Sequence, residues 1–172
     1  LGVFTSRDIP LDRLFAQWQG KNEGFTKGRD RSFHFGSNDH KIIGMISHLG
    51  PQMGVACGVA LSNKLKNNNN VTAVFTGDGG TSQGDFHEAL NLASTWDLPV
   101  IFCIENNGYG LSTPVNEQYA IENLADRGSS YNMDSHIVDG NNIVDVYRCI
   151  DTVIKKMRKD SKPVLIEFKT FR

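Results

Sequence analysis

One stretch of the chain, residues 71–110, constrains the fold more than any other, and it reads VTAVFTGDGGTSQGDFHEALNLASTWDLPVIFCIENNGYG. The β-branched and apolar run Val71–Thr76 predicts a strand that ends at a glycine-rich turn. We expect Asp85 to cap a helix after this turn, and Pro99 to precede a second buried strand over residues 100–104. The apolar positions of the helix have the spacing of a single helical face: Phe86, Ala89, Leu90, Ala93 and Trp96.

The two turns of this stretch should lie at the same edge of a sheet. Two consecutive strands joined by a helix are parallel and cross over right-handedly, so their carboxyl ends lie next to each other. The first turn covers residues 77–80 (GDGG), and the second contains Asn106, Asn107 and Tyr109. Open α/β sheets bind ligands at this edge. The stretch therefore predicts one ligand site built from both turns.

The polar groups at this edge suit a magnesium ion and a diphosphate. Asp78 offers a carboxylate, Asn107 an amide oxygen and Tyr109 a backbone carbonyl. Mg²⁺ accepts such oxygen ligands and keeps further positions for a phosphate, while amides at a helix start suit the phosphate itself. Three residues without a Cβ let the backbone come close to a ligand: Gly77, Gly79 and Gly80.

Either turn alone is a weak signal, because GDG is a common strand-to-helix turn and NNGYG is an ordinary Asn-Gly turn. Their combination at this separation is more specific, and it resembles the thiamine diphosphate motif, which begins GDG and ends NN. Within that group, the chain most resembles the alpha subunit of the thiamine-dependent first component of 2-oxo acid dehydrogenase complexes. The resemblance runs from about Phe33 to Arg172, and the string LSTPVNEQY at residues 111–119 is similar to the branched-chain type.

This resemblance implies an activity and the roles of the turn residues. The activity is a thiamine diphosphate- and Mg-dependent oxidative decarboxylation of a 2-oxo acid, with acyl transfer to a lipoyl group. Asp78, Asn107 and the carbonyl of Tyr109 would hold Mg²⁺. The amides of Gly79 and Gly80 would hold diphosphate oxygens.

Three residues before the glycine turn also acquire roles from the resemblance. His34, in the string Phe33–Gly36, would act on the substrate carbonyl and in acyl transfer. Leu49 would support the two rings of the cofactor, and Ser47 would make a backbone or side-chain contact. By composition alone, a lone histidine is more often a surface or packing residue. A potassium site of the branched-chain relatives uses a threonine where this chain has Pro51, so we do not carry that site over.

The resemblance further implies partners. A beta subunit, or a beta region of the same chain, would supply the carboxylate that protonates the aminopyrimidine ring, and a lipoyl-bearing acyltransferase would accept the acyl group. We expect an assembly of two alpha and two beta parts, branched-chain substrates ahead of pyruvate, and no activity from this chain alone. Two alternatives remain: another thiamine diphosphate enzyme, transketolase-like or synthase-like, and a non-catalytic phosphate-binding module.

The composition excludes some partners and indicates a compartment. Eighteen basic and nineteen acidic residues give a net charge of −1, which offers no electrostatic basis for non-specific binding to nucleic acid or membrane. Three separated cysteines without a CxxC pair indicate reduced thiols. No apolar run reaches about 18 residues, the length that a transmembrane helix needs, so the sequence predicts no such helix. We expect a protein of the cytoplasm, or of the mitochondrial matrix.

We expect residues 1–172 to form one diphosphate-binding domain of the α/β class, a mainly parallel sheet with helices on both faces. Leu1 begins in what reads as mid-domain sequence, so we expect a piece of a longer chain without a signal peptide. Further elements are predicted: helices over Asp8–Gly20, from Met53, over Ala120–Arg127 and over Ile143–Lys159, a loop over residues 21–41, and strands over Ser135–Val138 and Pro163–Phe168.

Overall fold

The computed structural model describes residues 2–44 and 47–172. Contacts within the chain divide it into two compact units, residues 1–48 and residues 49–172, each with its own core. The whole parallel sheet and both predicted turns belong to the second unit. That the chain acts as one diphosphate-binding domain stays a prediction.

The described part of the first unit contains two helices, α1 (Gly2–Thr5) and α2 (Leu11–Trp18). α2 confirms the amphipathic helix predicted over residues 8–20. The first unit has a small apolar core that this helix shares with the chain on either side of it: Phe4, Ile9, Leu14, Phe35 and Ile42.

A buried glutamine of α2 holds the loop predicted after the helix. Gln17 is only 2% exposed, and its Oε1 accepts a hydrogen bond from the Thr26 amide at 3.0 Å. Its Nε2 donates to the Arg31 carbonyl at 3.1 Å. The aperiodic stretch over residues 21–41 is therefore held by these polar contacts and by the packing of Phe25 and Phe35 in the core, rather than by secondary structure of its own.

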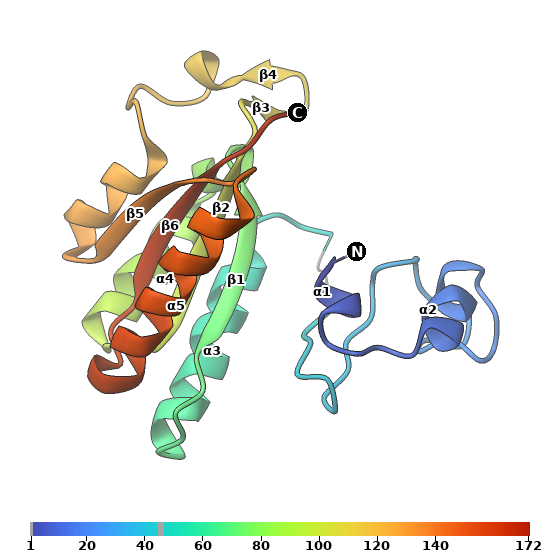
Figure 1. The fold of residues 1–172 in the computed structure, drawn as a ribbon. Helices are drawn as coiled ribbons and strands as arrows, with labels where there is room; N and C mark the ends of the chain where they lie inside the picture. The colour runs from blue at the N-terminus through green and yellow to red at the C-terminus, as the bar shows by residue number, and fades with distance from the viewer. Residues whose placement is uncertain (1, 45–46) are drawn as a thin grey trace. The chain divides into compact units, whose positions relative to one another are not determined.

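The second unit is built on a four-stranded sheet in the order β1-β2-β6-β5 (Figure 1). Every neighbouring pair of strands is parallel. The four strands predicted from the sequence are confirmed, with their ends within two residues of the prediction. Their observed bounds are Thr72–Gly77 for β1, Val100–Asn106 for β2, Asp134–Asp139 for β5 and Val164–Lys169 for β6.

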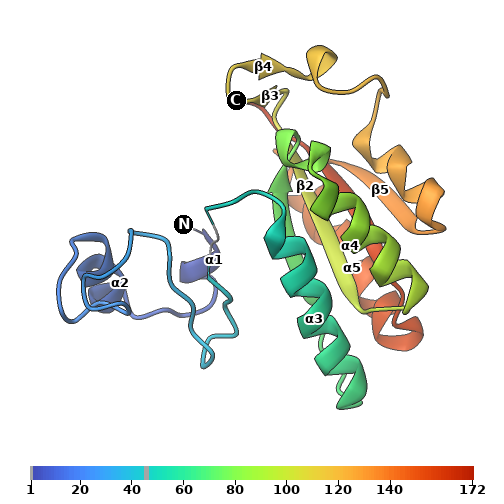
Figure 2. The same cartoon turned by 180° about the vertical axis from the view of Figure 1, so that it is seen from behind.

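Helices cover both faces of this sheet, as predicted for the α/β class (Figures 1 and 2). α3 (Pro51–Leu65) and α4 (Gly84–Thr95) pack on one face, and α5 (Ile143–Asp160) packs on the other. Successive residues of β2 point to opposite faces. Phe102 lies in the core under α3 and α4, whereas Cys103 lies in the core under α5. A strand buried on both sides explains the uninterrupted apolar run of β2.

α5 confirms the predicted helix over residues 143–159. Its N-cap is Asn142, whose side-chain oxygen accepts hydrogen bonds from the amides of Val144 and Asp145. Val153 and Met157 are the fully buried positions of its inner face. In the described part of the chain, neither α5 nor any other helix has the length and apolar character needed to cross a membrane.

Short elements follow the two turns of the site. A 3₁₀ helix, η1, lies between the first turn and α4, and a small antiparallel pair, β3 and β4, follows the second turn. Two more 3₁₀ helices, η2 and η3, connect this pair to β5. The bounds are Gly79–Ser82 for η1, Tyr109–Gly110 for β3, Thr113–Pro114 for β4, Val115–Glu117 for η2 and Leu124–Tyr131 for η3.

Three local predictions were wrong. Asp85 does not cap α4: Gln83 is the N-cap residue, and Asp85 lies within the first turn, because η1 delays the start of the helix. Trp96 is not on the buried face, since the helix ends before it and the side chain is 49% exposed. The helix predicted over residues 120–127 is replaced by η3, whose start is fixed by the burial of Leu124 in the core.

Candidate functional site

The two turns lie next to each other at the carboxyl edge of the sheet, as the sequence predicts. β1 and β2 pair in parallel from Thr72 with Val100 to Gly77 with Glu105, so both strands end at the same level. Residues 78–80 follow one strand and residues 107–109 follow the other. This is the edge at which open α/β sheets bind ligands.

Asp78 is the buried acid of this site. The residue is 1% exposed, and its Oδ2 accepts a hydrogen bond from Gln118 Nε2 at 3.2 Å. Its Oδ1 is also buried, and no residue that the structure describes donates a hydrogen bond to it. A buried carboxylate oxygen without a partner is costly in free energy. A divalent cation would be the missing partner, so the residues present fit a Mg²⁺ ion.

The second turn is shaped by its two asparagines. Asn106 Oδ1 accepts a hydrogen bond from the Gly108 amide at 3.1 Å, and Asn107 Oδ1 accepts one from the Tyr109 amide at 3.0 Å. Gly108 has a φ of +84°, a conformation that other residues rarely adopt. An amide oxygen has two lone pairs, so Asn107 Oδ1 retains one for a metal. Among the described residues, no cluster of three His, Cys, Asp or Glu offers an alternative metal site.

The glycines of the first turn differ in why they are needed. A Cβ on Gly80 would lie 2.2 Å from Thr76 Oγ1, and a Cβ on Gly79 would lie 3.0 Å from Gly110 Cα. A Cβ on Gly77 would meet no described protein atom closer than 3.9 Å. Packing within the protein therefore accounts for Gly79 and Gly80, but not for Gly77.

A third segment contacts both turns, and sequence reasoning missed it. Gln118 Nε2 donates to Asp78 Oδ2 and, at 2.7 Å, to the Thr113 carbonyl. The Tyr119 hydroxyl accepts a hydrogen bond from Asn106 Nδ2 at 3.0 Å. Both residues end the LSTPVNEQY string, which by its pattern indicates only the resemblance to the branched-chain type. Their contacts depend on the path of the chain through β3 and β4, which local pattern does not predict.

Arg127 of η3 is a second residue that sequence reasoning missed. Its Nη1 donates to the Thr81 carbonyl at 2.8 Å, and Thr81 Oγ1 in turn donates to the Asp78 carbonyl at 2.7 Å. The guanidinium also lies 5.7 Å from the centre of the Tyr119 ring. Burial lowers the pKa of Arg127 and raises the pKa of Tyr119 from their ordinary values. Arg127 thus holds the first turn from the side of η3.

His87 of α4 lies next to this arginine. Its Nδ1 is 2.8 Å from the Tyr131 hydroxyl. Burial lowers the pKa of His87 from its ordinary value, and the positive charge of Arg127 lowers it further. The folded protein therefore favours the neutral imidazole.

The first unit brings together two of the residues predicted before the glycine turn. His34 Nε2 lies 2.6 Å from Ser47 Oγ. His34 Nδ1 is buried and has no hydrogen-bond partner in the described part of the chain. Leu49 is exposed and belongs to the second unit.

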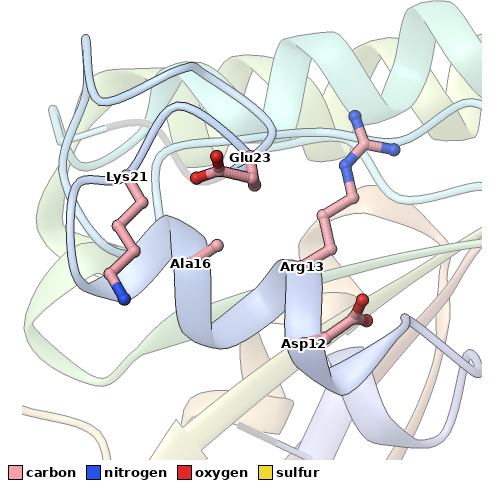
Figure 3. Close-up of a pocket in the computed structure, with 5 residues that line it drawn as sticks. All are labelled: Asp12, Arg13, Ala16, Lys21 and Glu23. Carbon is pink, nitrogen blue, oxygen red and sulfur yellow. The ribbon is translucent and has the colours of Figure 1, made fainter.

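The first unit also has an open pocket of about 390 Å³ on α2 and the loop that follows it (Figure 3). Figure 3 shows acidic and basic side chains that project from the helix and the loop in different directions. With two acids and two bases it has no net charge to select a ligand, and it contains none of the predicted site residues. The lining residues are Asp12, Arg13, Ala16, Lys21 and Glu23.

The parallel sheet, its helices on both faces and the two turns at one edge define an open α/β fold of the class that binds ligands at the carboxyl edge of its strands. A solved structure supports this class. It is that of a candidate thiamin diphosphate-dependent enzyme from Mycobacterium smegmatis, with a TM-score of 0.58 and 17% identity. The likeness covers 73% of this chain and 23% of that chain. At this identity it shows the fold alone.

The family follows from the sequence of the whole chain. Residues 1–172 match the family described as the dehydrogenase E1 component, and the chain belongs to this family. The prediction that it resembles the alpha subunits of the 2-oxo acid dehydrogenases is confirmed.

Curated relatives match almost the entire chain. The alpha subunit of acetoin:2,6-dichlorophenolindophenol oxidoreductase from Bacillus subtilis is 43% identical over 99% of this chain and 51% of its own length. The mitochondrial alpha subunit of human 2-oxoisovalerate dehydrogenase is 37% identical over 99% of this chain and 38% of its own length. The Arabidopsis thaliana alpha subunit 1 is 36% identical, with 99% and 36% covered. The chain thus spans about half the length of these relatives, or less.

We expect the protein to lose stability as the pH falls below the ordinary pKa of histidine, about 6.5. Because folding lowers the pKa of His87, the unfolded chain binds more protons in that range, and the stabilising effect of the neutral imidazole is lost as the pH falls. His87→Gln should therefore weaken the decrease of Tm between about pH 7 and pH 5. His48→Gln, at an exposed histidine, is the control. A decrease identical to that of the wild type in His87→Gln would contradict this interpretation.

Proposed function

We propose that this chain is the diphosphate- and metal-binding part of a thiamine diphosphate- and Mg²⁺-dependent 2-oxo acid dehydrogenase component. The complete protein would catalyse oxidative decarboxylation of a 2-oxo acid and transfer of the acyl group to a lipoyl partner. The observation that carries the proposal is Asp78, a buried carboxylate with one oxygen that no described residue binds, at the edge where the asparagine turn also begins. Membership of the dehydrogenase E1 component family supports it.

Three oxygens would hold the magnesium ion: an oxygen of the Asp78 carboxylate, Asn107 Oδ1 and the carbonyl of Tyr109. The diphosphate would fill further positions on the metal. The amides of Gly79 and Gly80 would donate to the diphosphate, whose negative charge favours a helix start. When bound, the thiamine group supplies the electron sink that lets a 2-oxo acid lose carbon dioxide.

The other proposed cofactor contacts are Ser47, Leu49 and Gly77. Packing does not require a glycine at Gly77, since a Cβ at this position would meet no described atom closer than 3.9 Å, whereas a close approach of the cofactor would require one. Leu49 is 58% exposed, so a cofactor ring could cover its side chain.

His34 is the proposed catalytic residue. The Ser47 hydroxyl at its Nε2 would fix the orientation of the imidazole, and Nδ1 is left without a described partner. A positioned imidazole transfers protons near neutral pH, so it could act at the substrate carbonyl and again during acyl transfer.

The complete enzyme would need partners. A beta subunit or beta region would contribute the carboxylate that activates the thiamine ring, in an assembly of two alpha and two beta parts, and a lipoyl-bearing acyltransferase would accept the product. The relatives are named as alpha subunits, which supports the first partner. A location in the cytoplasm or in the mitochondrial matrix fits this proposal, and the human relative is named as a mitochondrial protein.

A branched-chain 2-oxo acid is the first candidate substrate. The LSTPVNEQY string and the relatives named for 2-oxoisovalerate support this choice over pyruvate. Acetoin is the second candidate, because the relative named for acetoin is 43% identical, compared with 36% and 37% for the other two. The relatives thus leave two chemical classes of substrate to test.

Asp78→Asn in the complete protein should abolish Mg²⁺-dependent binding of thiamine diphosphate, because it removes the one anionic metal ligand. The metal-free protein should unfold at the same temperature as the wild type or higher, since a buried charge without full compensation is removed. Calorimetric titration at several Mg²⁺ concentrations and thermal unfolding measure the two effects. Glu105→Gln, at an exposed acid one residue before the end of β2, is the control. Unchanged affinity and metal dependence in Asp78→Asn would show that the metal site is elsewhere.

His34→Ala should leave cofactor affinity unchanged and lower kcat by about a hundredfold or more, if the imidazole transfers protons. The chain offers a matched control in His40, whose Nδ1 lies 2.7 Å from Ser37 Oγ in the same loop. His40→Ala should retain its turnover. Equal turnover in the two variants would show that His34 is a packing residue and not a catalytic one.

Specificity constants for a branched-chain 2-oxo acid, pyruvate and acetoin should decide between the substrate classes. With the complete protein, its partner and a lipoyl or dye acceptor, we expect the branched-chain acid to have the highest kcat/KM. A higher value for acetoin would establish the second candidate, and a higher value for pyruvate would contradict both.

A further inference from the structure

Glu167 is the most deeply buried charged residue of the second unit that neither the sequence motifs nor the proposed function involve. It lies on β6 and is 0% exposed. β6 is an inner strand of the sheet and pairs with β2, the strand that leads into the asparagine turn (Figure 1). A carboxylate in such a position must be compensated by several hydrogen bonds.

Three donors converge on this carboxylate. Asn106 Nδ2 and Lys169 Nζ each lie 2.6 Å from Oε1, and the Ala125 amide donates to Oε2 at 2.9 Å. All three neighbours donate, so the site requires a side chain with two acceptor oxygens and no donor. Glutamate meets this requirement, whereas glutamine would direct an NH₂ group at a donor.

The first of these contacts reaches the second turn. Asn106 uses Nδ2 to bind Glu167 and the Tyr119 hydroxyl, while its Oδ1 accepts the Gly108 amide. Glu167, the nearer of the two acceptors, and Tyr119 together therefore set the orientation of this one amide group. That orientation in turn fixes the loop that presents Asn107.

The contact with Ala125 reaches the first turn by a different route. The Ala125 amide is at the start of η3, and the same helix carries Arg127. Arg127 binds the carbonyl of Thr81, whose hydroxyl binds the carbonyl of Asp78. One carboxylate is thus connected to the second turn by hydrogen bonds, and to the first turn by hydrogen bonds and the backbone of η3.

We propose that Glu167 is a positioning residue that holds the two turns at the spacing needed to bind Mg²⁺ and a diphosphate together. This inference rests on the proposed function for its ligand, and on hydrogen bonds of this chain alone for its mechanism. Glu167 does not itself touch the ligand. It acts through Asn106 on one turn and through Ala125 and Arg127 on the other.

The test uses Glu167→Gln in the complete protein with its partner, compared with Ile166→Ala. Ile166 precedes Glu167 on β6, is also 0% exposed, and packs on the opposite face of the sheet under α5. Its truncation lowers stability without touching either turn. We expect Glu167→Gln to weaken thiamine diphosphate binding at fixed Mg²⁺ by tenfold or more in calorimetry. Ile166→Ala should bind with the affinity of the wild type.

A second measurement does not need the cofactor. In the ligand-free protein, the Gly108 amide should exchange its hydrogen at least tenfold faster in Glu167→Gln than in the wild type, because a neutral amide oxygen holds Asn106 more weakly than the carboxylate does. The amide of Phe102, in the middle of β2, is the internal reference. If Glu167→Gln does not fold, Glu167→Asp keeps the charge on a side chain one methylene shorter and is measured in the same way.

The outcomes separate the two hypotheses. Wild-type cofactor affinity and unchanged Gly108 exchange in the Glu167 variant would overturn the positioning role, as would equal losses of affinity in the Glu167 and Ile166 variants. Failure of the wild-type protein to bind thiamine diphosphate would instead contradict the proposed function. The exchange of Gly108 would then still decide whether Glu167 holds the turn.

Discussion

The parallel pairing of β1 with β2 is the constraint on which the rest of the site depends. Both ends of the site, Asp78 and the asparagine turn, are simply the residues that follow these strands. A slip of one residue in β2 would exchange Phe102 and Cys103 between two different apolar cores. The register is therefore held by core packing on both faces of the sheet. Because the turns directly follow the two strands, this register also sets their positions relative to each other.

Two buried carboxylates near this edge have opposite hydrogen-bond environments. Glu167 receives hydrogen bonds from three donors, and they use both of its oxygens. Asp78 has one oxygen bound by Gln118 and one without a described partner. A fully satisfied carboxylate fixes its neighbours, whereas a half-satisfied one is a site for a cation. This difference distinguishes the support of the site from its proposed metal ligand.

The elements that were predicted well are those with strong local patterns. β2 is a continuous apolar run, and α2 and α5 have apolar residues at helical spacing. The strand and the two helices that these patterns predict are all present in the structure. The errors occur where a contact from elsewhere changes a boundary. η1 takes up the residues before α4 and displaces Asp85 from the cap, and the burial of Leu124 shifts the helix expected over residues 120–127.

The sequence by itself determined the α/β class and the two turns, and it identified Asp78 and Asn107 as candidate metal ligands, because strand, turn and helix signals are local. Only the tertiary structure decided which distant side chains support them. Gln118 is 40 residues from Asp78, Arg127 is 46 residues from Thr81, and Glu167 is 61 residues from Asn106. These partners have no fixed spacing or period in the chain, because they meet only after the strands have packed in their final order.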